Sequence, residues 1–312
     1  MCAIKTTLPL AAVAVARLAT AASCDCYLID GAYPTYYKSH GFWDFRSLTQ
    51  YAGVPSILDS IDANKNADFS SSYFNWESEF AQFWGPQNWD NGAEDFVNVN
   101  SYNNLYIEKS SDSTFMTMRT ARLPKFQTSA EFESMDLFDH ASIRMYSRTI
   151  GSPGACTAVF TYREANSLKD VQESDIEILT SGPKTSIQYT NQPSYLEDGT
   201  TIDGASNNIS VSIPWNEWST QRLDWTPGRT TWYINGDQTF TMTFQAPKDP
   251  NKVNFNAWSD GGEWTGKMPE GGVAYQQIQW IEMLYNVADK ASCPNVCSID
   301  ADGAKPGSPV KI

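Results

Sequence analysis

Short apolar runs recur about every 10 to 15 residues from Asn104 onward, and turn-forming residues separate them. No long amphipathic helical pattern interrupts the series, and Asn235-Gly236 between two of the runs is a typical hairpin signal. This spacing predicts an all-β fold, a sandwich of antiparallel strands. The runs that we expect to form strands are 42–45, 105–107, 115–118, 126–133, 143–145, 159–161, 186–190, 209–213, 222–225, 231–234, 239–244, 253–258 and 277–286.

One further run, QESDIEIL at 172–179, carries an acidic stripe. It places Glu173, Asp175 and Glu177 at alternate positions, so a β-strand turns all three carboxylates to one face and the residues between them to the other. A chain of this acidic content holds about 0.5 such triplets by chance. By itself the stripe is typical of a solvated strand face, so the neighbouring segments must decide whether it is catalytic.

The segments around the stripe change its interpretation. AVFTYRE (158–164) precedes it, and SIQYTN (186–191), RLDWTPGRTTWYING (222–236) and NFNAWSDGGEWTG (254–266) follow it. In this order and at these spacings, the segments resemble glycoside hydrolase family 16, particularly its licheninase-like members. FQTSAEFES (126–134) and SIRMYSRTI (142–150) are similar to the two family strands upstream. The resemblance covers roughly residues 74–286 of the chain.

This resemblance implies a concanavalin A-like jelly roll of two curved antiparallel sheets, with few short helices and the substrate lying across the concave face. It also implies a retaining endo-β-glycosidase that hydrolyses a β-glucan with 1,3- or mixed 1,3-1,4 linkages by double displacement. Carried over residue by residue, it makes Glu173 the nucleophile, Glu177 the acid/base and Asp175 the assisting carboxylate. Two alternatives stay open: a cell-wall transglycosylase of the same fold, and a non-catalytic, lectin-like carbohydrate-binding sandwich.

The chemistry of a retaining glycosidase agrees with these residue types. One carboxyl attacks the anomeric carbon, and a second, about 5 to 5.5 Å away, protonates the leaving oxygen. Two long glutamate side chains on a twisted, concave sheet can lean toward each other across positions i and i+4 of a strand. Three clustered carboxylates do not all ionise at low cost, so at least one should hold a proton near neutral pH. We therefore expect a bell-shaped pH profile with its optimum on the acidic side of neutrality.

The resemblance also nominates substrate-binding residues, and for each of them a structural role in the fold is the alternative. Three departures from the family pattern, at Ser174, Glu133 and Ser219, leave the preferred glucan linkage open. The nominated residues are Glu131, Phe160, Tyr162, Tyr189, Asn256, Trp258 and Trp264.

The N-terminus predicts a secretory signal peptide over 1–22, with an apolar run followed by small residues. We expect one catalytic domain over 23–300, with an irregular N-terminal segment at about 23–70 that contains a short helix near 56–63. A flexible tail should follow over 301–312. After the leader the sequence has no run of 18 or more apolar residues, so we expect a secreted, extracellular protein without a membrane span.

The charge balance limits the partners. The sequence has 22 Lys and Arg against 36 Asp and Glu, a formal net charge of −14. Polyanion binding depends on basic surface, so we expect no nucleic-acid partner. We expect a monomer that binds a neutral polysaccharide and no membrane. No cysteine-histidine spacing suggests zinc, and we expect no metal site and no required cofactor, although the resemblance allows a structural calcium ion. An N-glycosylation sequon begins at Asn208 and agrees with secretion.

Five cysteines remain once the leader is removed, and secretion favours disulfides between them. Cys24 and Cys26 lie near the beginning of the chain, and Cys293 and Cys297 lie near its end. We therefore predict bridges that tie the N-terminal segment to the C-terminal one, with Cys156 as the odd thiol. The sequence leaves the connectivity within these two pairs open.

Overall fold

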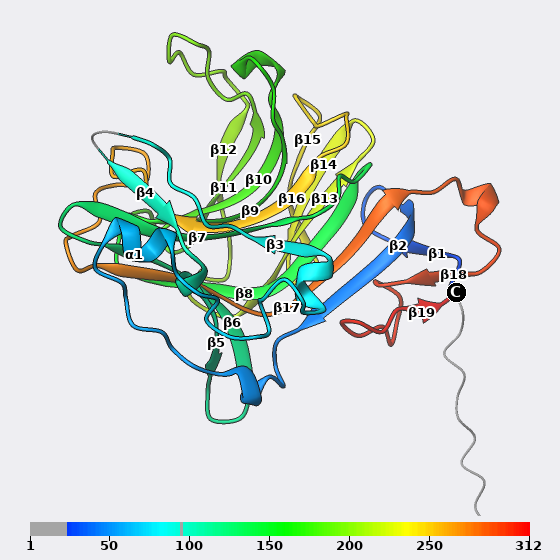
Figure 1. Cartoon of the computed structure of the whole chain (residues 1–312). Coiled ribbons are helices and arrows are strands. Elements are labelled where there is room, and N and C mark those ends of the chain that lie inside the picture. The colour runs from blue at the N-terminus through cyan, green and yellow to red at the C-terminus, as the bar shows by residue number, and fades with distance from the viewer. Residues whose placement is uncertain (1–23, 94–95) are drawn as a thin grey trace, which may run out of the picture.

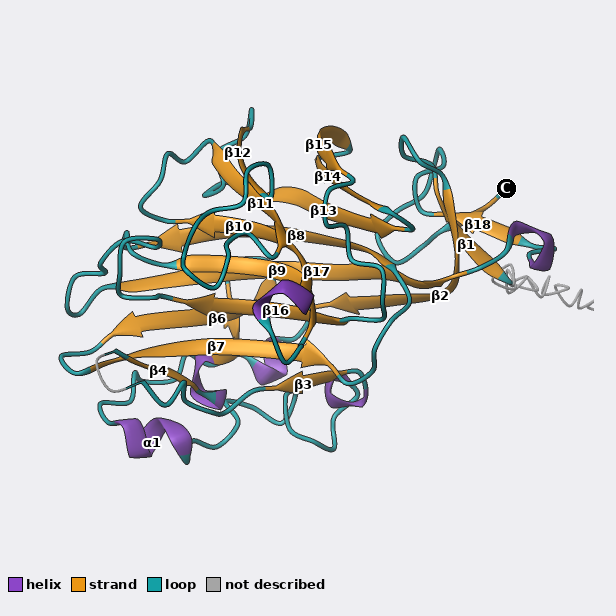
Figure 2. Ribbon diagram, turned by 90° about the horizontal axis from the view of Figure 1, so that it is seen from above, coloured by secondary structure: helices purple, strands orange, loops and turns teal. Residues whose placement is uncertain are grey.

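The computed structural model describes residues 24–93 and 96–312, so the expected signal peptide lies outside the described residues. These residues form a sandwich of two curved sheets, shown from two directions in Figure 1 and Figure 2. The all-β, antiparallel fold predicted from the sequence is confirmed. In the part of the chain that the structure describes, no helix is both long enough and apolar enough to cross a membrane.

One sheet, called the concave sheet here, holds the acidic stripe on a strand near its centre. Its strands curve around an open face in Figure 1. Every strand in this sheet is hydrogen-bonded antiparallel to its neighbour, which fixes which side chains share a face. From edge to edge the order is β12 (Ser206–Ser210), β11 (Ser186–Gln192), β10 (Gln172–Leu179), β9 (Cys156–Arg163), β16 (Lys252–Trp258), β7 (Phe126–Ser134) and β3 (Trp84–Pro86).

The other sheet, the outer sheet, is organised around one long strand, β17 (Val273–Val287). On one side β17 pairs with β8, and on the other it pairs first with β6 and then with β2. The start of β7 pairs with β6 and its end pairs with β16, so β7 joins the two sheets. The remaining strands are β15 (Asp237–Met242), β14 (Arg229–Ile234), β13 (Ser219–Thr226), β8 (Ala141–Gly151), β6 (Thr114–Arg122), β5 (Leu105–Lys109), β4 (Val97–Asn100), β2 (Thr35–Asp44), β1 (Cys26–Ile29), β18 (Val296–Ser298) and β19 (Val310–Lys311).

The local signals place most elements correctly, with shifts at some boundaries. Asn235 and Gly236 have φ of 50° and 89° and form the predicted hairpin turn between β14 and β15. β12 lies earlier than the expected 209–213, and the expected helix near 56–63 begins only after Ser60, whose Oγ caps it. The helical segments are α1 (Ile61–Lys65) and the 3₁₀ turns η1 (Thr49–Tyr51), η2 (Phe80–Gln82), η3 (Tyr102–Asn104), η4 (Leu168–Asp170) and η5 (Lys290–Ser292).

The core lies between the two sheets and fixes the position of β10. Ile176 and Ile178 of β10 point into this core and are 2% exposed. Trp232 of β14, on the opposite sheet, is fully buried, and its indole Nε1 donates a hydrogen bond to the backbone oxygen of Asp175 (2.9 Å). The apolar face of β10 is therefore held by the core, which leaves its acidic face turned outward from it.

The two ends of the chain meet at one end of the sandwich, to the right in Figure 1. β1 pairs with β2 on one side and, in parallel, with β18 on the other, and β19 pairs with β18. The segment from about 23 to 70 that we expected to be irregular thus contains two strands, and the tail that we expected to be flexible contributes one. The pairings of β1 with β18 and of β2 with β17 join segments far apart in the sequence, so local patterns do not reveal them.

Two disulfides close this end of the molecule. Cys24 is bonded to Cys297, and Cys26 to Cys293. Cys156 is a free thiol and is buried. The prediction that the bridges tie the N-terminal segment to the C-terminal one is confirmed.

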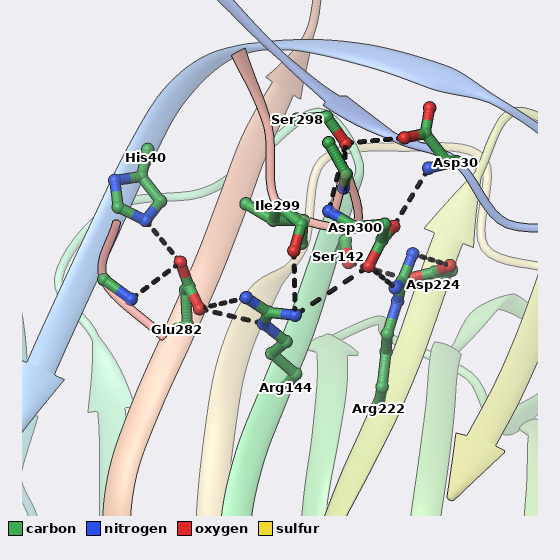
Figure 3. Close-up of polar contacts among 12 residues, drawn as sticks. Asp30, His40, Ser142, Arg144, Arg222, Asp224, Glu282, Ser298, Ile299 and Asp300 are labelled. Atoms are coloured by element: carbon green, nitrogen blue, oxygen red, sulfur yellow. Dashed lines mark hydrogen bonds and ion pairs between the residues drawn. The ribbon is translucent and has the colours of Figure 1, made fainter. Parts of the chain in front are cut away.

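A buried network of charges joins the terminal strands to the outer sheet (Figure 3). Glu282 of β17 is fully buried, accepts two hydrogen bonds from Arg144 of β8 (2.8 and 2.6 Å), and lies 2.7 Å from Nε2 of His40. Burial by itself raises the pKa of Glu282, but its bonds to His40 and Arg144 outweigh burial, and the pKa is lowered. Arg222 bridges Asp224 (2.7 Å) to Asp300 (2.8 Å) in the same network, so the C-terminal segment is tied to β13.

Removing the arginine from this network should destabilise the fold. Arg144→Met leaves the Glu282 carboxylate buried without its main charge partner, so we expect the free energy of unfolding to fall by about 3 kcal/mol in urea denaturation. Arg144→Met combined with Glu282→Leu should recover much of the loss, because the buried charge is then gone. An Arg144→Met protein as stable as the parent would contradict this account of the network.

Candidate active site

The acidic stripe lies on the open face of the concave sheet. Glu173 and Glu177 are partly exposed there, and Asp175 between them is 1% exposed. All three positions alternate with the core-facing residues of β10, as the period of a strand requires. The neighbouring strands β9 and β11 pair with β10 along most of its length, so the three carboxyls share a face with side chains of both strands.

Two donors from β11 hold the side chain of Glu177. Gln188 Nε2 donates to Glu177 Oε2 (2.9 Å), and Thr190 Oγ1 donates to the same oxygen (3.0 Å). Thr190 is itself 2.9 Å from the hydroxyl of Ser206 on β12. Because both bonds reach Oε2, the other carboxyl oxygen of Glu177 is left to interact with a bound molecule.

Burial raises the pKa of all three carboxyls above the ordinary range. For Glu173 burial is the largest cause, the charge of Glu177 adds to it, and the neighbouring Asp175 carboxyl lowers the pKa. The pKa of Asp175 is raised well above its usual value, by burial first and then by the charges of the two glutamates. For Glu177 burial again dominates, while the bonds from Thr190 and Gln188 lower the pKa. The three groups therefore titrate as one cluster.

Two adjoining cavities meet at Glu173 and make a groove across the sheet. The first, called the Glu177 cavity, has a volume of about 640 Å³ and is walled by Tyr195 on one side and by Trp258 and Trp264 on the other. The second, called the Glu131 cavity, has a volume of about 530 Å³. Glu173 lines both cavities and Glu177 lines the first, so the acids lie at the middle of an open groove and not at its end.

The Glu131 cavity is acidic. Burial, and after it the charge of Glu133, raises the pKa of Glu131 to about 7, although a hydrogen bond donated by Asn100 Nδ2 (3.1 Å) lowers it. Glu133 stands where the family pattern has an arginine, and it forms an ion pair with Lys252 of β16. The departure at Ser174 lies on the opposite face of β10, where the side chain is fully buried.

The structure brings most of the nominated binding residues to the groove. Trp258 and Trp264 lie with ring centroids 5.7 Å apart, and Trp264 is 38% exposed. Asn256 is on the same face of β16 as Trp258, opposite Ala158 of β9 and Glu131 of β7. The groove is lined by Glu131, Phe160, Tyr162, Trp258 and Trp264.

Asn256 itself lines neither cavity. Tyr189 is also outside the groove, because the structure puts it in the core. It is 1% exposed, lies opposite Ile176 of β10, and stacks on Trp232 with ring centroids 5.0 Å apart. Its hydroxyl is 3.1 Å from that of Thr239. In SIQYTN the apolar residues Ile187 and Tyr189 alternate with polar ones, and this alternation places Tyr189 on the buried face.

The polar residues of the same strand were not among the nominated residues. Gln188 and Thr190 occupy the open face of β11 and contact Glu177, as the alternation in SIQYTN indicates. Tyr195 and Trp89, which also line the groove, lie in loops, and Asn254 lines the Glu131 cavity from β16. No local pattern marks loop residues as cavity walls, because their positions depend on strands that are distant in sequence.

No group of three or more His, Cys, Asp or Glu that could hold a metal ion is found among residues 24–93 and 96–312. The arrangement at the groove is one of carboxyls, amides and aromatic rings. Such groups can transfer protons, form a covalent ester and bind sugar hydroxyls and ring faces.

The chain is similar to several bacterial β-glucanases. It is 25% identical to a β-glucanase of Paenibacillus macerans over 160 residues, 50% of this chain and 65% of that protein, which is slightly less than two thirds of its length. It is 23% identical to a β-glucanase of Bacillus subtilis over 245 residues, 75% of this chain and 95% of that protein. The solved structure of a β-1,3-1,4-glucanase derived from a mouse hindgut metagenome has a similar fold, with a TM-score of 0.55 and 18% identity over 80% of this chain and all of that one.

The family match covers the groove and the strands that build it. The model described as "Glycosyl hydrolases family 16" matches residues 91–282, which is more than half of the chain and runs from before β4 into β17. This span includes β10 and both strands that flank it. The chain therefore belongs to family 16 of the glycosyl hydrolases and is a glycoside hydrolase.

Proposed function

We propose that this protein is a secreted, retaining endo-β-glycosidase that hydrolyses β-glucan with 1,3- or mixed 1,3-1,4 linkages. The observation that carries the proposal is the set of three carboxyls on one face of β10, with Asp175 buried between two partly exposed glutamates and Glu177 held by two donors in an open groove. Glu173 is the nucleophile, Glu177 the acid/base, and Asp175 the residue that assists Glu173.

In the first step the Glu173 carboxylate attacks the anomeric carbon, and Glu177 gives its proton to the glycosidic oxygen. The raised pKa of Glu177 keeps that proton available. The raised pKa of Asp175 keeps it protonated, and the neighbouring Asp175 carboxyl lowers the pKa of Glu173, which favours the ionised nucleophile. The product of this step is a covalent glycosyl-enzyme, and the leaving sugar carries the proton away.

In the second step Glu177, now ionised, takes a proton from water. The water oxygen attacks the anomeric carbon, and the bond between the sugar and Glu173 breaks. The hydrogen bonds from Gln188 and Thr190 stabilise the carboxylate that exists between the two steps. Cleavage within a chain is supported by the position of the acids, because the groove continues on both sides of Glu173.

The substrate class is supported by the groove and by the relatives. Trp258 and Trp264 offer apolar ring faces, which suit the faces of neutral glucose rings. The proteins to which the chain is similar are β-glucanases by name. Secretion is supported by the two disulfides, since such bonds persist in oxidising compartments.

Replacing the two catalytic glutamates should abolish hydrolysis without unfolding the protein. We expect Glu177→Gln to lower kcat on lichenan and laminarin by about 10² to 10⁴-fold, because the general acid is lost. Glu173→Gln should show no turnover, because a carboxamide does not form the glycosyl-enzyme. Product release read by mass spectrometry checks both.

The exposed Glu217→Gln is the matched control and should keep parental activity. Parental activity in Glu173→Gln would contradict the proposal. Products longer than the substrate, lost in Glu173→Gln, would instead assign transglycosylation to the same acids.

The high-pH limb of the rate profile should respond to the donors on Glu177. Activity falls as pH rises through the pKa of Glu177, because the proton needed for the first step is then lost. Thr190→Val removes a bond that lowers this pKa, so the limb of kcat/KM should move upward by about 0.5 to 1 pH unit. Thr241→Val on β15 serves as the control, and a limb that stays in place or moves downward in Thr190→Val would refute the assignment.

A further inference from the structure

The Glu131 cavity, on the other side of Glu173 from the Glu177 cavity, has an unusual charge distribution. Four glutamates line it, namely Glu131, Glu133, Glu164 and Glu173. Lys252, next to this cavity, is neutralised by its ion pair with Glu133. Carboxyls bind sugar hydroxyls by hydrogen bonds, and none of the described lysines or arginines lines this cavity to pair with an acid group. The cavity therefore favours a sugar with hydroxyls and disfavours one with acid groups.

One amide in this cavity has an unmet donor. Asn254 is 2% exposed, and its Nδ2 has no hydrogen-bond partner among the described residues. The other fully buried asparagines all satisfy this atom; for example, Asn191 donates to the backbone oxygen of Phe244 (2.9 Å), and Asn251 to that of Gln172 (3.1 Å). A buried polar group without a hydrogen-bond partner costs free energy of folding, so this unpaired amide is a candidate for binding a ligand.

Asn254 is close enough to β10 to contact a sugar bound at the carboxyls. In the sheet it lies opposite Glu133 of β7 and Phe160 of β9, and Phe160 in turn lies opposite Asp175. Asn254 is therefore two strands, roughly 10 Å, from the catalytic strand, which is a distance that a bound sugar ring can cover. The terminal torsion of an asparagine has a broad energy minimum, so a small rotation turns Nδ2 toward a ligand in the cavity.

We propose that Asn254 is a specificity-determining residue, whose amide donates a hydrogen bond to a hydroxyl of the sugar bound beside Glu173. Glu131 and Glu133 accept hydrogen bonds from hydroxyls of the same sugar. Together these groups select a neutral sugar unit and reject one that carries a carboxylate or sulfate. The inference rests on the proposed function, because it places the sugar on the nucleophile side of the acids.

Binding to an inactive protein tests the inference apart from catalysis. In the full-length Glu173→Gln protein, calorimetry measures the Kd of a linear β-1,3-1,4-linked glucose tetrasaccharide and of the same compound oxidised to carry glucuronic acid. We expect the neutral compound to bind at least about tenfold more tightly than the oxidised one. Adding Asn254→Ala or Asn254→Asp should weaken binding of the neutral compound about tenfold, the loss of one hydrogen bond to a buried group.

Asn254→Asp keeps the shape of the side chain and exchanges the amide for a carboxyl, so a loss of binding shared by Asn254→Asp and Asn254→Ala is not a packing defect of the smaller side chain. Gln238→Ala, an exposed amide on β15, is the matched control and should bind like the parent. In the active protein, Asn254→Asp should raise KM about tenfold and leave kcat within about threefold, as expected when uniform binding is lost.

The outcomes separate this inference from the proposed function. Unchanged binding in both Asn254 variants, or equal binding of the neutral and oxidised compounds, would overturn the inference even if the parent hydrolyses β-glucan. Conversely, a parent that binds the neutral compound through Asn254 but hydrolyses no β-glucan would support the inference and refute the proposed function.

Discussion

The structure depends on the clustering of three carboxyls on one face of a single strand, with Asp175 buried between two partly exposed glutamates. Strand alternation brings Glu173, Asp175 and Glu177 to the same side of β10, and their mutual repulsion and loss of hydration favour protonation. The fold accepts this cost because the other face of β10 is secured in the core and its backbone is bonded to Trp232. In the proposed double displacement, one of these carboxyls gives a proton while another attacks as the carboxylate.

The charged residues at the terminal strands differ from the three carboxyls of β10, because they are paired with opposite charges. In the network at the terminal strands, each carboxylate meets a cation, so the pKa of Glu282 is lowered although the side chain is fully buried. The network fastens the C-terminal segment to the outer sheet, and the two disulfides bond that segment to Cys26 of the N-terminal strand β1 and to Cys24 just before it. The acids at the terminal strands therefore have charge partners and stabilise the fold. The acids of β10 lack such partners within the described segments and are the proposed catalytic groups.

Much of the site was predictable because it depends on the period of a strand. Alternation within QESDIEIL is enough to place the acids on one face, and the ordered motifs around it predicted the family and the fold. The same alternation within SIQYTN places Tyr189 in the core, and relying on the motif match alone led to its nomination. The strands at the two ends and the loop residue Tyr195 were not predictable, since their positions depend on pairing between distant segments.

The central claim is that Glu173 and Glu177 act by double displacement, and the configuration of the first product tests it most directly. Proton NMR can follow the anomeric signal of the newly formed reducing end while the protein cleaves a β-linked glucan, before mutarotation mixes the anomers. The account predicts that the β-anomer is released first, because two inversions restore the original configuration. Initial release of the α-anomer would mean a single displacement by water and would contradict the role given to Glu173.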